Sequence, residues 1–255
     1  MSVGSILLTI FVLILLYLLI SYVVRDANRL TGLISGKTMT RIEASSLATD
    51  STNTNASNFT YSIWFYVEDW NYRYGEPKVV FGRMGSVSPV GEGPIDGLSG
   101  LDPCPAVVLG AVENNLIISL GCYPGADQAP DHPSGKSIVH NCNITNVPIQ
   151  KWVNLLVSVY GRTMDVYLDG KLVKTCILPG VAKINKDAPV YVTPKGGFSG
   201  WTSKFQYWPH ATDPQEAWNT YVKGYGASWL GNIFGQYKVE VTVTKNGTPI
   251  NSTEV

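Results

Sequence analysis

The sequence lacks the patterns that mark a nucleic-acid-binding protein or a common type of enzyme. Lys+Arg and Asp+Glu both number 19, so no net charge draws the chain to a polyanion. No G-x-S-x-G motif is present to carry a nucleophile, and no glycine loop ends in the Lys-Ser/Thr pair that holds phosphate. We therefore expect no nucleic-acid partner and no nucleotide chemistry.

Cysteine and histidine are also scarce. The four cysteines form no C-x-x-C pair, and the three histidines lie far from any cysteine-based zinc spacing, so a zinc site is not expected. Cys104 and Cys122 flank a predicted hairpin in near-opposite register, which makes a bridge between them geometrically feasible. Whether these two cysteines, Cys142 or Cys176 form disulfides depends on the side of a membrane that they face, and the sequence leaves the pairing open.

Charge is absent from the first long stretch of the chain. Ile6 to Val24 contains no charged residue, proline or glycine, and a helix of this length is about 28 Å long, close to the thickness of a hydrocarbon core. A cleaved signal peptide is disfavoured because Met1 to Ser5 carries no basic residue and the apolar run is long. We predict a single transmembrane helix within residues 1–30. Its apolar side chains include Ile6, Phe11, Leu15, Leu19 and Val24.

The rest of the chain is predicted to be a stalk and one all-β domain. We expect a stalk or linker over 31–57, an antiparallel β-sandwich with one short helix over 58–224, and a linker with a last strand or hairpin over 225–255. The strongest strand pattern ends in Asp169-Gly170, which favours a two-residue hairpin. Asp213 before Pro214 is typical of a helix start.

Two signals conflict over the side of the membrane that the domain faces. Basic residues follow the apolar stretch and place the domain on the cytosolic side by the positive-inside rule; they are Arg25, Arg29, Lys37 and Arg41. N-x-S/T sequons, which are glycosylated only on the other side, occur at Asn55, Asn58, Asn143, Asn246 and Asn251. Because this excess over chance is small, we predict the cytosol-derived side.

Three segments carry a family resemblance. In order they are YSIWFYVEDW, VPIQKWVNLLVSVYGRTMDVYLDGKLVKTCILPG and GGFSGWTSKFQYWPHATDPQEAWNTYVKG. Together, over about Phe59 to Gly224, they resemble the concanavalin A-like lectin/glucanase fold in its laminin-G-like form, which implies a jelly-roll β-sandwich. The N-terminal anchor combined with KTCILPGVAK and YVTPKGGFSG is similar to membrane-anchored virion proteins of large double-stranded DNA viruses. That similarity implies a minor capsid protein that links the inner membrane to the shell, with other capsid proteins as partners.

Catalytic residues are not evident. The hydrolase branch of this fold needs two carboxylates about 5 Å apart on one strand face. Glu68 and Asp69 are adjacent, so on a strand they point to opposite faces, and Asp169 is explained by its turn. We expect no enzyme, and a glycoside hydrolase is the weakest alternative.

The best candidates for a ligand or protein contact follow the first long strand. They are Asp69, Trp70, Asn71, Tyr72 and Tyr74. Such residues could bind a glycan in a surface lectin, the main alternative function, and a bound Ca²⁺ held by them or by Asp96 and Asp102 is a weaker alternative. Packing of the aromatic rings against a loop or a neighbouring protein is favoured. We therefore predict a non-catalytic docking protein with no cofactor.

Overall fold

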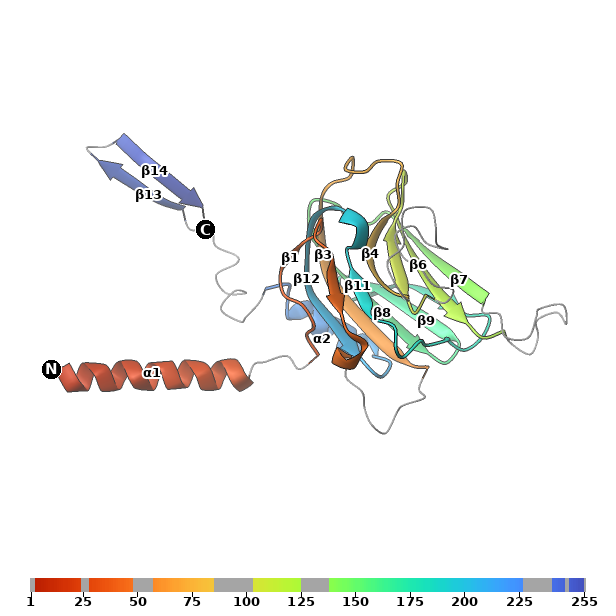
Figure 1. Cartoon of the computed structure of the whole chain (residues 1–255), viewed down its shortest axis with the longest axis horizontal. Coiled ribbons are helices and arrows are strands. Elements are labelled where there is room, and N and C mark those ends of the chain that lie inside the picture. The colour runs from red at the N-terminus through yellow and green to blue at the C-terminus, as the bar shows by residue number, and fades with distance from the viewer. Residues whose placement is uncertain are drawn as a thin grey trace.

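The computed structural model describes residues 3–23, 28–47, 57–84, 103–124, 138–226, 240–245 and 248–254. Two antiparallel six-stranded sheets face each other in a β-sandwich (Figure 1), which confirms the predicted all-β class. Sheet A has the order β1 (Ile34–Ser35), β12 (Ser199–Trp208), β3 (Phe59–Asp69), β8 (Trp152–Tyr160), β9 (Thr163–Leu168), β10 (Lys171–Ile177). Sheet B has the order β2 (Thr40–Ile42), β11 (Val190–Val192), β4 (Lys78–Arg83), β5 (Ala106–Leu109), β6 (Asn115–Cys122), β7 (Ile138–Thr145).

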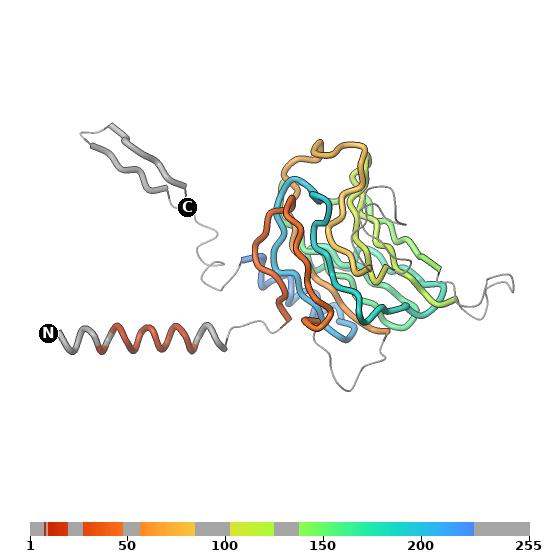
Figure 2. The backbone as a smooth tube through the Cα atoms, in the orientation of Figure 1, coloured from red at the N-terminus to blue at the C-terminus, as the bar shows by residue number. Residues whose placement is uncertain are grey.

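The core lies between the two sheets because alternate residues of each central strand point inward. In β3 these are Tyr61, Ile63, Phe65 and Val67, each at most 1% exposed. Complete burial of one such apolar side chain is worth about 1.5–3 kcal/mol. The segment 28–47, drawn in red to orange in Figure 2, adds β1 to sheet A and β2 to sheet B. Part of the predicted stalk therefore completes the sandwich.

Helix α2 (Pro214–Val222) covers part of the outer face of sheet A. Leu156 and Tyr167 of the sheet are buried together with Ala217 of the helix. The predicted helix start is confirmed, because the Asp213 carboxylate accepts a hydrogen bond from the Glu216 N–H at 2.7 Å. Because α2 packs on this outer face, the residues of β8 that point outward are buried as well. They include the polar residues Asn154 and Ser158, which alternate with the inward-pointing apolar residues of the strand.

The hairpin predicted from Asp169-Gly170 is confirmed. These two residues join β9 to β10 with φ values of 50° and 72°, the left-handed region that two-residue hairpins of type I′ require. Glycine is needed here for a second reason. A Cβ on Gly170 would lie 3.0 Å from atoms of both Trp218 and Tyr221, so the hairpin turn touches α2 closely.

A disulfide joins Cys142 of β7 to Cys176 of β10, with their Cα atoms 6.2 Å apart. The bridge that the sequence made feasible between Cys104 and Cys122 is not formed, and both side chains are buried. The disulfide connects the last strand of sheet B to the last strand of sheet A. Closing a loop with a sequence separation of 34 stabilises the fold by about 4 kcal/mol in a chain-entropy treatment.

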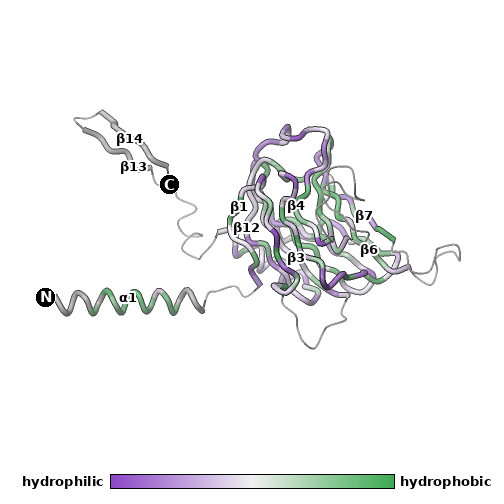
Figure 3. The backbone as a smooth tube through the Cα atoms, in the orientation of Figure 1, coloured by the Kyte–Doolittle hydropathy of each residue, from purple (hydrophilic) through white to green (hydrophobic). Residues whose placement is uncertain are grey.

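Besides α2, the elements outside the two sandwich sheets include a long helix and a two-stranded hairpin. Helix α1 (Val3–Val23) covers the predicted apolar stretch up to Val23, and its described part is mostly in the hydrophobic colour in Figure 3. The side chains described there are 48–65% exposed. Among the described residues no helix combines the length and the hydropathy of a membrane span, so the predicted transmembrane helix is not found. Near the C-terminus, β13 (Glu240–Lys245) and β14 (Thr248–Glu254) pair only with each other. The described residues also form two short 3-10 helices, Ala44–Ser46 and Pro194–Gly196.

Candidate binding surface

The five predicted contact residues lie at one corner of the sandwich, at the end of β3 and on the turn that leads to β4. Asp69 Oδ1 accepts a hydrogen bond from the Asn71 N–H at 2.9 Å, so this carboxylate shapes the turn. Trp70 packs against the core, and Tyr72 lies beneath the Lys37 ammonium, 4.7 Å from the ring centre. Only Tyr74, at 59% exposure, presents a large apolar surface to solvent. The structure therefore brings the five together but uses three of them within the fold.

Arg73 ties this corner to the rest of the domain. Its Nε lies 2.7 Å from Glu76 Oε2, and one of its other nitrogens donates to the Lys195 carbonyl at 2.7 Å. The Gly75 N–H donates to the Ala111 carbonyl at 3.0 Å. Arg73 itself has a φ of 52°, which costs conformational energy for a residue with a side chain. The corner is therefore held closed by contacts to two other loops.

A buried lysine lies below the same corner. Lys78 is 1% exposed, and its ammonium sits 4.8 Å from the centre of the Trp70 ring. Burial, and then the charge of Arg73, lower the pKa of Lys78. Within the part of the chain that the structure describes, neither Lys78 Nζ nor Trp70 Nε1 has a hydrogen-bond partner. The Trp70 ring is thus one favourable contact of this charge, and the carboxylates of Glu76 and Asp69 also favour its protonated form.

A second group of aromatic side chains lies on the outer face of sheet A. Strand register places Trp201 of β12 and Trp152 of β8 directly opposite Tyr66 of β3, so the three form a row across adjacent strands. The rings of Tyr66 and Trp152 are 5.8 Å apart. One step along the same face of β3, Trp64 is opposite Asn154 and 4% exposed.

Helix α2 and the residues after it extend this row. Tyr225 stacks on Trp152 with ring centres 4.5 Å apart, and Tyr221 stacks on Trp64 at 5.6 Å. Trp218 contacts Tyr221 at 5.5 Å. We call this set the outer aromatic surface; it comprises Trp64, Tyr66, Trp152, Trp201, Trp218, Tyr221 and Tyr225.

Hydrogen bonds fix the segment that supplies Tyr225. Ser203 donates to the Tyr225 carbonyl at 2.8 Å, and Lys204 Nζ donates to the Gly224 carbonyl at 2.7 Å. Gly224 has a φ of 67°, which ends α2 and directs the chain back onto the sheet. The stacked rings are therefore preorganised by β12.

The outer aromatic surface differs from the corner in its exposure. Trp201 is 45% exposed, Trp218 43% and Tyr225 37%. Polar groups border the row: Glu68 is exposed beside Tyr66, and Lys151 forms an ion pair with Asp169 at 3.0 Å. A partly exposed set of aromatic rings with a polar border is typical of a binding surface.

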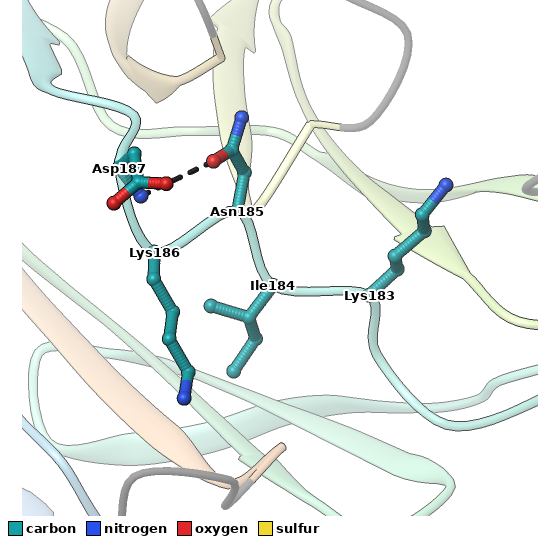
Figure 4. Close-up of a pocket in the computed structure, with 5 residues that line it drawn as sticks. All are labelled: Lys183, Ile184, Asn185, Lys186 and Asp187. Carbon is teal, nitrogen blue, oxygen red and sulfur yellow. Dashed lines mark hydrogen bonds between the residues drawn. The ribbon is translucent and has the colours of Figure 1, made fainter.

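A hollow of about 410 Å³ lies elsewhere, along the loop from Lys183 to Asp187 between β10 and β11. Figure 4 shows that the ammonium groups of Lys183 and Lys186 point away from each other, and that the Asp187 N–H donates to Asn185 Oδ1. Ligand pockets usually combine convergent groups from several elements. One loop lines this hollow, so we do not consider it the functional site.

Several carboxylates of the described residues are each engaged by a hydroxyl group or a basic side chain. Glu68 accepts a hydrogen bond from Ser199 at 3.4 Å, and Asp165 accepts one from Thr175 at 2.5 Å on another strand. No group of three His, Cys, Asp or Glu side chains there could hold a metal ion. Asp96 and Asp102, the other candidates for Ca²⁺, lie outside the described residues.

Sequence reasoning missed the outer aromatic surface. Trp64, Trp152 and Trp201 come from three strands that are distant in sequence and adjacent only in the sheet order β12-β3-β8. One indication was present in the sequence. A solvent-exposed strand face usually carries polar residues, as Thr60 and Ser62 do here, but Trp64 and Tyr66 continue the same face of β3 with aromatic rings.

Comparison with known proteins supports the fold. No family model matches the chain, and no curated protein matches it in sequence. The receptor-binding domain of botulinum neurotoxin D gives a TM-score of 0.52 at 10% identity, covering 76% of this chain and 44% of that one. The receptor-binding domain of the botulinum neurotoxin C/D mosaic serotype gives 0.50 at 9% identity, covering 77% and 43%. This chain thus spans less than half of each domain, and the likeness shows that it shares a β-sandwich with them.

Proposed function

We propose that the chain is a non-catalytic docking protein that attaches its β-sandwich to a protein partner through the outer aromatic surface. The observation that carries this proposal is the partial exposure of Trp201, Trp218 and Tyr225 in one preorganised group. Tryptophan and tyrosine are enriched in protein interfaces, where a few such rings supply most of the binding free energy. Ordering them costs little here, since hydrogen bonds within the domain already hold the segment after α2.

The setting of this docking protein is also part of the proposal. Helix α1 would hold the domain at a membrane, since its described side chains are apolar and about half exposed. The sandwich would be of the concanavalin A-like, laminin-G-like form, and the protein would be a minor capsid component between the inner membrane and the shell of a large DNA virus. Both of these finer assignments rest on the resemblance of the sequence to those families.

A site-specific cross-linking experiment tests the docking role. A photoreactive phenylalanine derivative is placed at position 201, or at position 160 as a matched control, in the full chain expressed in its membrane. Tyr160 is 68% exposed at the far end of β8, away from the aromatic row. We expect one discrete adduct from position 201 and none from position 160. Equal labelling from both positions, or none from 201, contradicts the proposal.

A glycan is the second candidate partner. The half-exposed Trp201 ring, in the row with Tyr66, offers a flat face on which the apolar face of a sugar can stack. Glu68 and Lys151 can hydrogen-bond to hydroxyl groups at the border of the row. The full chain in detergent is applied to a glycan array. Glycan binding that disappears in Trp201→Ala and persists in Tyr160→Ala supports a lectin function. Binding that is equal in both variants excludes this surface as the glycan-binding site.

A further inference from the structure

A disulfide and a hydrogen bond connect the two sheets at one edge of the sandwich. Cys142 and Cys176 form a disulfide between β7 and β10, the terminal strands of sheets B and A. The Lys174 ammonium, also on β10, donates to the Asn143 carbonyl of β7 at 2.8 Å. A disulfide that joins two sheets forms and persists in an oxidising compartment and is rare in the reducing cytosol.

The residue after the first cysteine begins a sequon, Asn143-Ile144-Thr145. Because side chains alternate along β7, Cys142 and Ile144 point into the sandwich while Asn143 and Thr145 are exposed. Both side chains that define the sequon therefore face solvent from a strand that pairs on one side only.

Another described sequon, Asn58-Phe59-Thr60, provides the contrast. Asn58 Oδ1 accepts a hydrogen bond from the Gly161 N–H at 2.9 Å, and Thr60 is completely buried, with its hydroxyl donating to the His210 carbonyl at 2.8 Å. A bulky oligosaccharide at Asn58 would disturb these contacts. At Asn143 an oligosaccharide can extend into solvent, because the side chain lies at the surface of the strand.

We propose that Asn143 carries an N-linked oligosaccharide, and that the sandwich therefore folds on the lumenal or outer side of its membrane. The Asn143 amide nitrogen forms a bond to the first sugar's anomeric carbon and loses a proton. The bond between that carbon and the diphosphate of a lipid-linked oligosaccharide donor breaks, and the lipid diphosphate leaves. The inference opposes the cytosolic orientation predicted from the basic residues, and with it the proposed position between an inner membrane and a capsid shell. It does not depend on docking through the outer aromatic surface.

The glycan also has a structural consequence. An edge strand exposes hydrogen-bonding groups that can pair with another chain, and proteins protect such edges with charges or bulky groups. Here Lys174 occupies one carbonyl of β7, and the oligosaccharide on Asn143 shields the outer side of the same strand. The glycan thus protects the same side of the sandwich that the disulfide closes.

The test uses the full chain expressed in insect or mammalian cells that perform N-glycosylation. Peptide mass spectrometry before and after glycosidase treatment reads the occupancy of Asn143, and non-reducing digestion reads the pairing of Cys142 with Cys176. We expect a glycosylated Asn143 and an intact disulfide in the same molecules. Asn143→Gln and Thr145→Ala should each remove one glycan, whereas Thr145→Ser, which keeps the sequon, should retain it.

Two results would each overturn the inference. One is an unmodified Asn143 in wild-type protein that has passed through these cells. The other is alkylation of both Cys142 and Cys176 when no reductant has been added. Because Thr145→Ser changes the side chain without removing the sequon, it separates loss of the glycan from misfolding of β7.

Discussion

Two aromatic regions of the sandwich differ in what surrounds their rings. At the corner, Trp70 covers the Lys78 ammonium and packs against the core, and Arg73 holds the turn closed. On the outer face of sheet A, Trp201 and Trp218 are nearly half exposed. The first region stabilises a charge inside the fold, whereas the second presents apolar area to solvent. We therefore assign the corner tryptophan to stability, and we propose a binding role for the exposed rings of the outer face.

Removing the corner tryptophan should have the largest effect. Trp70→Ala deletes a ring that packs against the core and leaves the Lys78 ammonium without its aromatic contact, so we expect a loss of about 3 kcal/mol in the free energy of unfolding. Urea unfolding of the full chain measures it. Cross-linking from position 218 should be unchanged under conditions where the variant is folded. A loss below about 1 kcal/mol would show that the ring is not a structural contact.

Removing an exposed tryptophan should lower partner binding and leave stability nearly unchanged. Trp201→Ala leaves the unfolding free energy within about 0.5 kcal/mol, because the side chain lies at the surface. The yield of partner adducts from a photoreactive residue at position 218 should fall at least tenfold, about 1.4 kcal/mol. If the yield persists while stability falls, the outer ring is structural, and the contrast between the regions disappears.

Removing the buried charge sharpens the account of the corner. Lys78→Met keeps the apolar length of the side chain and removes an ammonium that has no hydrogen-bond partner among the described residues, so stability should rise by about 1 kcal/mol at pH 7. Equilibrium unfolding of both proteins measures the change.

The pH dependence of this gain has a defined sign. The pKa of Lys78 is lowered in the folded state, chiefly by burial, so the unfolded state holds the proton more tightly. Wild-type stability should therefore rise as the pH increases toward about 10.4, the ordinary lysine value, while a methionine at this position does not titrate. The advantage of Lys78→Met should shrink over that range. An advantage that is constant with pH would mean that the lysine charge is not the cause.

The smallest effect is expected at Tyr74. This ring is 59% exposed on the corner turn, outside the outer aromatic surface. Tyr74→Ala should change the free energy of unfolding by less than about 0.5 kcal/mol and leave the position-218 adducts unchanged. A marked loss of adducts would mean that the partner reaches the corner, and the two regions would then form one interface.

Local sequence patterns predicted the elements whose cause is local. Asp169-Gly170 determines its hairpin through backbone conformation, and Asp213 determines the start of α2 through one hydrogen bond. Residues 59–69 alternate with apolar side chains on both faces, a pattern that favours a central strand, and sheet A places β3 between β12 and β8.

Features that depend on the third dimension were not predictable. The Cys142–Cys176 bridge requires the last strands of two different sheets to meet, which no spacing reveals. The predicted contact residues lie together at one corner, but the Trp70 ring packs beside the buried Lys78 ammonium. The half-exposed tryptophan on the outer face of sheet A is Trp201, which the sequence analysis did not single out. The predicted side of the membrane remains a prediction.

Radical footprinting of the full chain compares the two regions directly, and it can be performed before the partner is identified. Oxidation rates of Trp201, Trp218, Tyr74 and Tyr160 are measured by mass spectrometry in the purified protein and in the membranes of the cells that produce it. Docking through the outer aromatic surface predicts that Trp201 and Trp218 react several-fold more slowly in the membranes, while Tyr74 and Tyr160 react alike in both preparations. Equal rates for Trp201 in the two preparations would contradict the docking proposal.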